Sequence, residues 1–142
     1  MKKKIFYLFP LTILLLTSCT GKTDYKFINS EVNIVSIELG YVEDLNSDDE
    51  ITQKFIVLST LKNDEFTLLL NQLKDLECFM YYTDPGTLNN GSMSIKIAYN
   101  NGDFEIIGAN GQAIYKDGCY DTCGYYYFDD VMFQELIDSW IN

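Results

Sequence analysis

The residues best suited to chemistry are the cysteines, because the chain has four of them and neither histidine nor arginine. Cys119 and Cys123 stand between two glycines, where a turn is expected to join two strands. This spacing is compatible with a local disulfide, with two free thiols, or with a Cu(I) or Zn(II) site that takes further ligands from Cys78 or Met80. Without an imidazole, Ser-His-Asp and Cys-His catalysis are excluded. We therefore expect no metal and no cofactor, and we expect Cys78 to be a buried free thiol.

A second candidate for chemistry is an acidic stretch, from Asp44 to Glu50, in which oxygen-bearing side chains recur at alternate positions. With the isoleucine that follows, it resembles the opening of a calcium-binding loop. The sixth position is Asp49 where such loops have glycine, and the twelfth is Phe55 where they have glutamate. The prediction is a solvated acidic loop between two strands, with weak calcium binding left open.

The first eighteen residues have the composition of a secretory signal peptide. Lys2, Lys3 and Lys4 precede an apolar run from Ile5 to Leu16, and polar residues follow from Thr20 onward. A membrane-spanning helix needs about 20 apolar residues, whereas this run has about a dozen. The segment therefore predicts export and not a permanent membrane anchor.

The signal segment ends in Leu16-Thr17-Ser18-Cys19, which resembles the lipobox of bacterial lipoproteins. In that family the cysteine sulfur receives a diacylglyceryl group and the chain is cut before the cysteine. The resemblance implies that Cys19 becomes the lipidated first residue, on the extracytoplasmic side of the cell membrane or outer membrane. An ordinary secreted protein is the alternative. Because disulfides form outside the cytosol, export favours a disulfide between Cys119 and Cys123.

The charge of the chain limits its partners. Removing residues 1–18 leaves 124 residues with seven lysines and 21 acidic side chains, a net charge of −14. A surface this negative repels nucleic-acid phosphates and anionic lipid headgroups. We expect the lipid to attach the chain to the membrane, and no nucleic acid among its partners.

Hydrophobic periodicity predicts one α+β domain over residues 31–142, after a lipidated tether at 19–30. Apolar residues alternate from Val35 to Tyr41, and a helix is expected from Asn63 to Leu76. Turn signals then recur about every seven to eleven residues, at Asn90-Gly91, Asn101-Gly102, Asn110-Gly111 and Asp117-Gly118. A closing helix capped by Asp129 follows. The predicted fold is a single curved antiparallel sheet in the order ββαβββββα, with both helices on one face.

Tyrosines gather in the predicted strand that leads into the last helix. Successive side chains on a strand point to opposite faces, so Tyr126 must point away from Tyr125 and Tyr127. Since Phe128 leads into the helix, we expect Tyr126 to lie in the core with it. Tyr125 and Tyr127 are then expected on the open face of the sheet, as binding residues. A covering layer over that face is the alternative.

These observations favour a non-catalytic module that binds a protein or peptide partner in the cell envelope, of which an inhibitor-like or immunity-like role is one form. A structural subunit of an envelope complex is the first alternative, and a carboxylate-based enzyme acting on glycans is the second.

The lipobox gives a direct test. Replacement of Cys19 by alanine is expected to abolish lipid attachment, because the acceptor sulfur is lost. Metabolic labelling with an alkyne fatty acid measures this, and a labelled Cys19→Ala protein would contradict the assignment.

Overall fold

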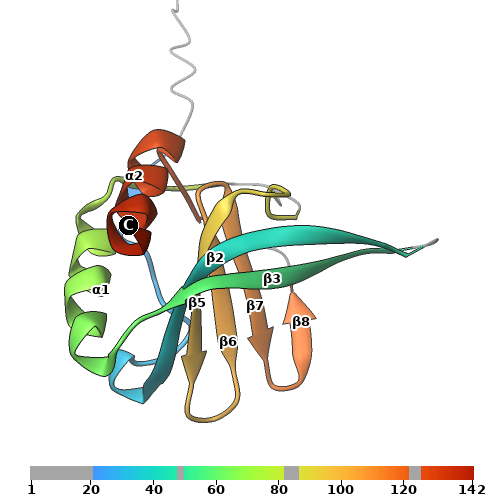
Figure 1. Cartoon of the computed structure of the whole chain (residues 1–142), viewed down its shortest axis with the longest axis horizontal. Helices are drawn as coiled ribbons and strands as arrows, with labels where there is room; N and C mark the ends of the chain where they lie inside the picture. The colour runs from blue at the N-terminus through green and yellow to red at the C-terminus, as the bar shows by residue number, and fades with distance from the viewer. Residues whose placement is uncertain (1–20, 48–49, 82–86, 122–125) are drawn as a thin grey trace, which may run out of the picture.

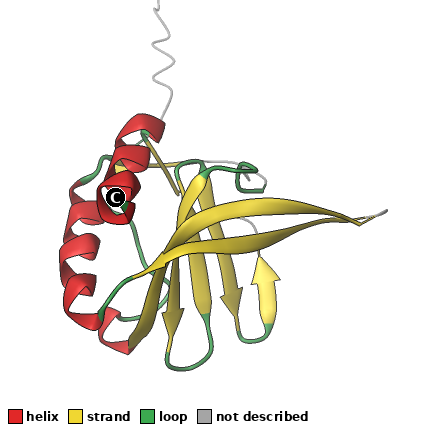
Figure 2. Cartoon of the chain, in the orientation of Figure 1, coloured by secondary structure: helices red, strands yellow, loops and turns green. Residues whose placement is uncertain are grey.

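The computed structural model describes residues 21–47, 50–81, 87–121 and 126–142, which form an α+β fold with two helices and two antiparallel sheets (Figures 1 and 2). The larger sheet has six strands in the order β3-β2-β5-β6-β7-β8, and the smaller has three in the order β1-β4-β9. The strands are β1 (Lys22–Thr23), β2 (Ile34–Ser47), β3 (Glu50–Thr60), β4 (Cys78–Met80), β5 (Met93–Tyr99), β6 (Phe104–Gly108), β7 (Gly111–Lys116), β8 (Cys119–Asp121) and β9 (Tyr126–Phe128).

The α+β class and the two helices agree with the prediction, but the single sheet and the strand order do not. Six strands separate the helices where five were expected, and β1 was not expected at all. The difference arises because β4 and β9 are three-residue strands that pair with each other and, through β4, with β1. The strand at β9 was expected from the sequence, but strands of two or three residues carry too little alternation to show which strands they pair with.

Each helix begins with a local polar contact and buries one apolar stripe. The 3₁₀ turn η2 (Asn63–Glu65) leads into α1 (Phe66–Asp75), and the Lys62 backbone N–H donates to the Glu65 carboxylate at 2.7 Å. The second helix, α2 (Asp130–Ile141), is capped as predicted: the Asp129 side chain accepts from the Met132 N–H at 3.0 Å. The helices are joined where the Trp140 indole donates to the Gln72 side chain at 2.7 Å.

Both faces of the six-stranded sheet are covered. One face packs against α1 and α2 in the main core, which includes Ile37, Leu39, Ile95, Ile97, Ile107, Leu69, Leu73, Phe133 and Ile137. On the other face, Val42 and Phe55 of the β2–β3 hairpin pack against Ile106 and Ala113 of β6 and β7. The long hairpin crosses over these strands (Figure 1). The face that the sequence predicted to be open is therefore partly covered by the first hairpin.

Gly40 permits this crossing. The pairing of β2 with β3 shifts between Leu39 and Gly40, and a Cβ placed on Gly40 would lie 1.9 Å from the Ile56 carbonyl oxygen. No side chain fits at that distance, so only glycine allows the two strands to approach here.

The segment before Glu31 belongs to the fold. Lys22 and Thr23 form β1, and Tyr25 is buried in the main core, with Phe27 and Ile28 packed against it. Residues 22–28, which the prediction assigned to the tether, therefore contact the domain.

A buried carboxylate fixes this segment to the sheet. Glu105 of β6 is fully buried and accepts four hydrogen bonds. The Tyr25 hydroxyl and the Gln112 amide each donate at 2.5 Å, the Ile28 N–H donates at 3.2 Å, and the Tyr99 hydroxyl is the fourth donor. Burial raises the pKa of the Glu105 carboxyl above its ordinary value, and the four donors partly offset that rise.

The raised pKa predicts a pH-dependent stability. A carboxyl whose pKa is higher in the folded than in the unfolded chain contributes stability below its ordinary pKa, and this contribution is lost as the pH rises through the folded value. The difference in unfolding free energy between wild type and Glu105→Gln should therefore shrink as the pH is raised from about 4.5. Urea denaturation across that range measures it. Glu135→Gln, at an exposed position on α2, is the charge-matched control, and parallel wild-type and Glu105→Gln profiles would contradict the prediction.

Candidate functional site

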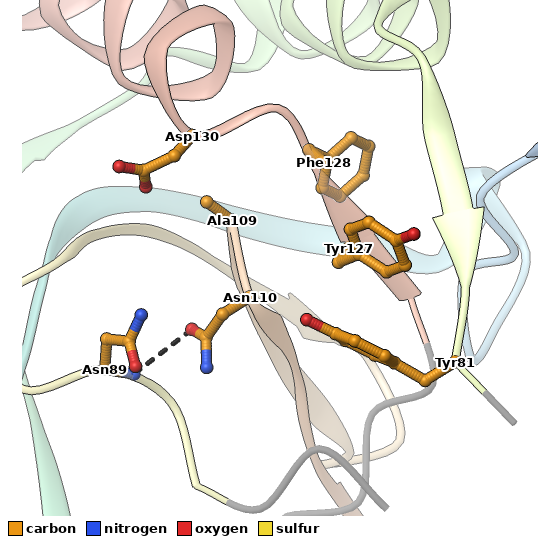
Figure 3. Close-up of a pocket in the computed structure, with 7 residues that line it drawn as sticks. All are labelled: Tyr81, Asn89, Ala109, Asn110, Tyr127, Phe128 and Asp130. Carbon is orange, nitrogen blue, oxygen red and sulfur yellow. Dashed lines mark hydrogen bonds between the residues drawn. The ribbon is translucent and has the colours of Figure 1, made fainter. Parts of the chain in front are cut away.

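The two sheets meet beside the turn between β6 and β7, where the Phe128 N–H of β9 donates to the Ala109 carbonyl at 2.8 Å. A pocket of about 210 Å³ opens at this junction (Figure 3). It is lined by residues of β9, of the β6–β7 turn, of the segments that follow β4 and precede β5, and of the start of α2: Tyr81, Asn89, Ala109, Asn110, Tyr127, Phe128 and Asp130.

One wall of the pocket is aromatic. The ring of Tyr127 stacks on Phe79, its neighbour across the β4–β9 pair, with centroids 5.3 Å apart. The ring of Tyr81 lies 4.3 Å from that of Tyr127, at an angle of 32°, and its hydroxyl points into the pocket (Figure 3). Burial and the neighbouring Tyr127 raise the pKa of the Tyr81 hydroxyl above its ordinary value. Like any protonated phenol, this hydroxyl can donate a hydrogen bond.

The opposite wall is polar. The Asn110 side chain accepts from the Asn89 N–H at 3.1 Å and donates to the Thr87 carbonyl at 3.2 Å. These two bonds hold the segment before β5 against the β6–β7 turn. Asp130, the first residue of α2, is exposed and is the one charged side chain among the described residues that line the pocket.

The structure confirms the directions that were predicted for the side chains of Tyr126, Tyr127 and Phe128, the three residues of β9. Tyr126 packs against the main core with its ring 5.0 Å from Tyr25, and Phe128 is buried beside Phe133 of α2. Tyr127 points the other way and lines the pocket. Tyr125, the second predicted binding residue, lies outside the described residues.

The structure describes two of the four cysteines, Cys78 and Cys119. Cys19 and Cys123 lie outside the described residues, so lipidation and the Cys119–Cys123 disulfide stay predictions. Cys119 is exposed at the start of β8, and Cys78 is a buried thiol, as expected. Burial, together with the charge of Asp24, raises the pKa of the Cys78 thiol to about 11, which makes it a poor nucleophile at neutral pH.

The calcium interpretation of the acidic stretch is not supported by the backbone. From Asp44 to Ser47 the chain is paired in β2, and Glu50 begins β3, so the expected loop is mainly the far end of a hairpin. Asp44 accepts from the Gln53 amide at 2.8 Å across the two strands. Within the described ranges, no three Cys, Asp or Glu side chains converge to hold a metal ion, while Asp48 and Asp49 lie outside them.

Sequence reasoning missed the polar half of the pocket and the buried Glu105 cluster. Asn89, Asn110 and Asp130 are far apart in the chain and meet only through the fold. The sequence gives a weak indication that Glu105 is special, because a carboxylate flanked by Phe104 and Ile106 is unusual in a strand that is buried on both faces. It is enclosed by its four donors and does not line the pocket, so its role is structural.

Comparison with known proteins gives no identification: no protein-family model, no curated protein and no solved structure matches the chain. In the part of the chain that the structure describes, neither helix is long and apolar enough to cross a membrane.

The opposite orientations of Tyr126 and Tyr127 predict different costs on truncation. Tyr126→Ala should lower the free energy of unfolding by about 3 kcal/mol, because it leaves a cavity beside Tyr25. Tyr127→Ala should lower it by about 1 kcal/mol, since it removes ring contacts at the edge of a pocket. Urea denaturation of the two variants measures the difference. A larger loss for Tyr127→Ala would show that its ring is a core element and not a pocket wall.

Proposed function

We propose that this protein is a lipid-tethered binding module of the bacterial cell envelope, which recognises a protein or peptide partner through the pocket between its two sheets. The observation that carries the proposal is the placement of Tyr81 and Tyr127 in this pocket, opposite polar groups that rigid elements hold in place. Tyrosines provide a large contact area at low entropic cost and are enriched where proteins bind one another.

The position of β1 supports a role close to the membrane. Lys22 pairs with Phe79 and Thr23 with Cys78 in an antiparallel register, so the first residue of β1 lies beside the half of β4 that leads to Tyr81. From Cys19 to Lys22 an extended chain covers about 10 Å. A lipid on Cys19 would hold the pocket end of the domain near the bilayer, and a partner within or beside the membrane would meet that end first.

The described residues of the pocket do not support the alternative of a glycan hydrolase. Such enzymes use two carboxyl groups about 5–9.5 Å apart around the bond they cut. Asp130 is the single carboxylate that the described lining contributes, and the buried Glu105 is already bonded to four donors.

A structural subunit remains a second candidate function, because of the outer edge of the larger sheet. β3 is an eleven-residue end strand that, among the described strands, pairs with β2 alone. Val57 and Leu58 on this strand are 45% and 52% exposed. A long edge with exposed apolar side chains can accept a strand from a neighbouring protein.

Affinity purification of the tagged protein from native envelopes, followed by quantitative mass spectrometry, tests the proposal. A Tyr81→Ala/Tyr127→Ala variant should lose most of the partner that the wild type retains, because the aromatic wall is removed. Tyr115→Ala is the matched control, since Tyr115 stacks on Phe104 at 5.0 Å and does not line the pocket.

A Val57→Lys variant separates the two candidate functions. It blocks strand addition at β3 and leaves the pocket intact, so the proposed module should keep its partner. Loss of the partner with Val57→Lys, and its retention with the double tyrosine variant, would favour the structural subunit.

A further inference from the structure

We infer that the pocket receives a single cationic side chain, lysine or arginine, from a partner with a basic surface. This inference rests on the proposed function of the same pocket and names the chemistry that the pocket would recognise. Four features carry it: the size of the pocket, its aromatic wall, its local charge and the charge of the whole domain.

The size of the pocket fits one side chain. Sites that enclose whole small molecules are typically about 300–1,000 Å³, and this pocket is smaller, about 210 Å³. It is lined in part by exposed residues and is therefore open enough for a side chain on a partner's surface to enter. An extended lysine or arginine could enter while its backbone stays outside.

The aromatic wall suits a cation. A lysine ammonium or an arginine guanidinium within about 6 Å of a tyrosine ring is attracted by the negative face of the ring. Tyr81 and Tyr127 lie 4.3 Å apart between centroids, too close for a cation to enter between the rings, so a bound cation would lie against the face of Tyr81 that Tyr127 does not cover. The chain shows the same chemistry elsewhere, where the Lys96 ammonium lies 5.3 Å from the ring centre of Phe104.

The local charge also favours a cation. Asp130 is the charged member of the described lining, and no described lysine belongs to it. The start of α2 carries a partial positive charge of about half a unit, which opposes cation binding. Two carboxylates stand at this helix start, Asp129 as its cap and Asp130 as its first residue, and together they outweigh that partial charge.

The hydrogen-bonding groups of the described lining favour a side chain that carries several donors. A guanidinium has five N–H donors and no acceptor, so it needs acceptors around it. The pocket supplies the Asp130 carboxylate, the Tyr81 hydroxyl oxygen and the side-chain carbonyl of Asn89, for which the structure gives no hydrogen bond to another described residue. Among the described lining residues there is no cation to pair with an anionic ligand.

The charge of the whole domain would act at longer range. After removal of residues 1–18 the chain has seven lysines against 21 acidic side chains. Three of these lysines are already paired with glutamates, Lys22 with Glu77, Lys74 with Glu31 and Lys96 with Glu38. The resulting negative field steers a basic partner towards the surface and repels an acidic one.

The test compares two peptides that differ in charge but not in shape. The full-length protein, isotope-labelled and purified in detergent, is titrated with acetyl-Gly-Gly-Arg-Gly-Gly-amide and with the same peptide carrying neutral citrulline in place of arginine. NMR shift changes at Tyr81, Asn110 and Tyr127 report binding. The arginine peptide should shift these signals at about five- to tenfold lower concentration than the citrulline peptide.

Two variants locate the interaction. Asp130→Asn should weaken binding of the arginine peptide by about threefold to fivefold and leave binding of the citrulline peptide unchanged. Asp64→Asn is the control, because Asp64 is an exposed aspartate in η2 that does not line the pocket. Addition of 0.5 M salt should reduce the preference for arginine, because it screens the exposed Asp130.

Equal shifts with both peptides, or shifts that miss the pocket, would overturn the inference. Stronger shifts with ethanolamine than with the arginine peptide would also overturn it, in favour of a lipid headgroup. These outcomes are separate from the test of the proposed function. Loss of the native partner in Tyr81→Ala/Tyr127→Ala without a preference for arginine would keep the binding module and reject the cationic ligand.

Discussion

The fold depends on the burial of one carboxylate, that of Glu105. Removing a charge from water costs several kcal/mol unless hydrogen bonds replace the lost hydration. Four donors replace part of that hydration here, from Tyr25, Ile28, Tyr99 and Gln112, and they come from β5, β7 and the segment before Glu31. Losing any one donor would leave a buried charge partly unsatisfied. The network therefore stabilises a single position of the N-terminal segment on the sheet.

The candidate site inherits its geometry from this network. Tyr25 donates to Glu105 and also lies 5.0 Å from Tyr126 and 5.8 Å from Phe128, measured between ring centroids. These contacts fix which side of β9 enters the core, and strand alternation then directs Tyr127 to the other side, where it lines the pocket. A polar cluster in the core thus determines the orientation of an aromatic side chain at the surface.

The sequence predicted the parts of this fold that depend on local patterns. The stripe of α1, the Asp129 cap and the turns at Gly102 and Gly118, which have positive φ angles, all follow from neighbouring residues. The three-stranded sheet could not be predicted, because β1, β4 and β9 are two or three residues long and pair across large separations. For the same reason, the alternation of side chains along β9 gave the direction of Tyr127, but no local pattern places Asn89, Asn110 and Asp130 beside it.

The segment from Lys22 to Ile28 would connect the proposed lipid on Cys19 to the proposed binding pocket. A flexible tether of a dozen residues would let the domain rotate freely above a bilayer, and a lipid on Cys19 would then fix distance without orientation. In this structure β1 and Tyr25 are held in the fold, and in the sequence two residues separate Cys19 from the start of β1. A short linker narrows the range of positions that the pocket can reach and raises its effective concentration near partners at the same membrane. For a pocket that binds a single side chain, whose intrinsic affinity is small, this gain would decide whether a complex forms.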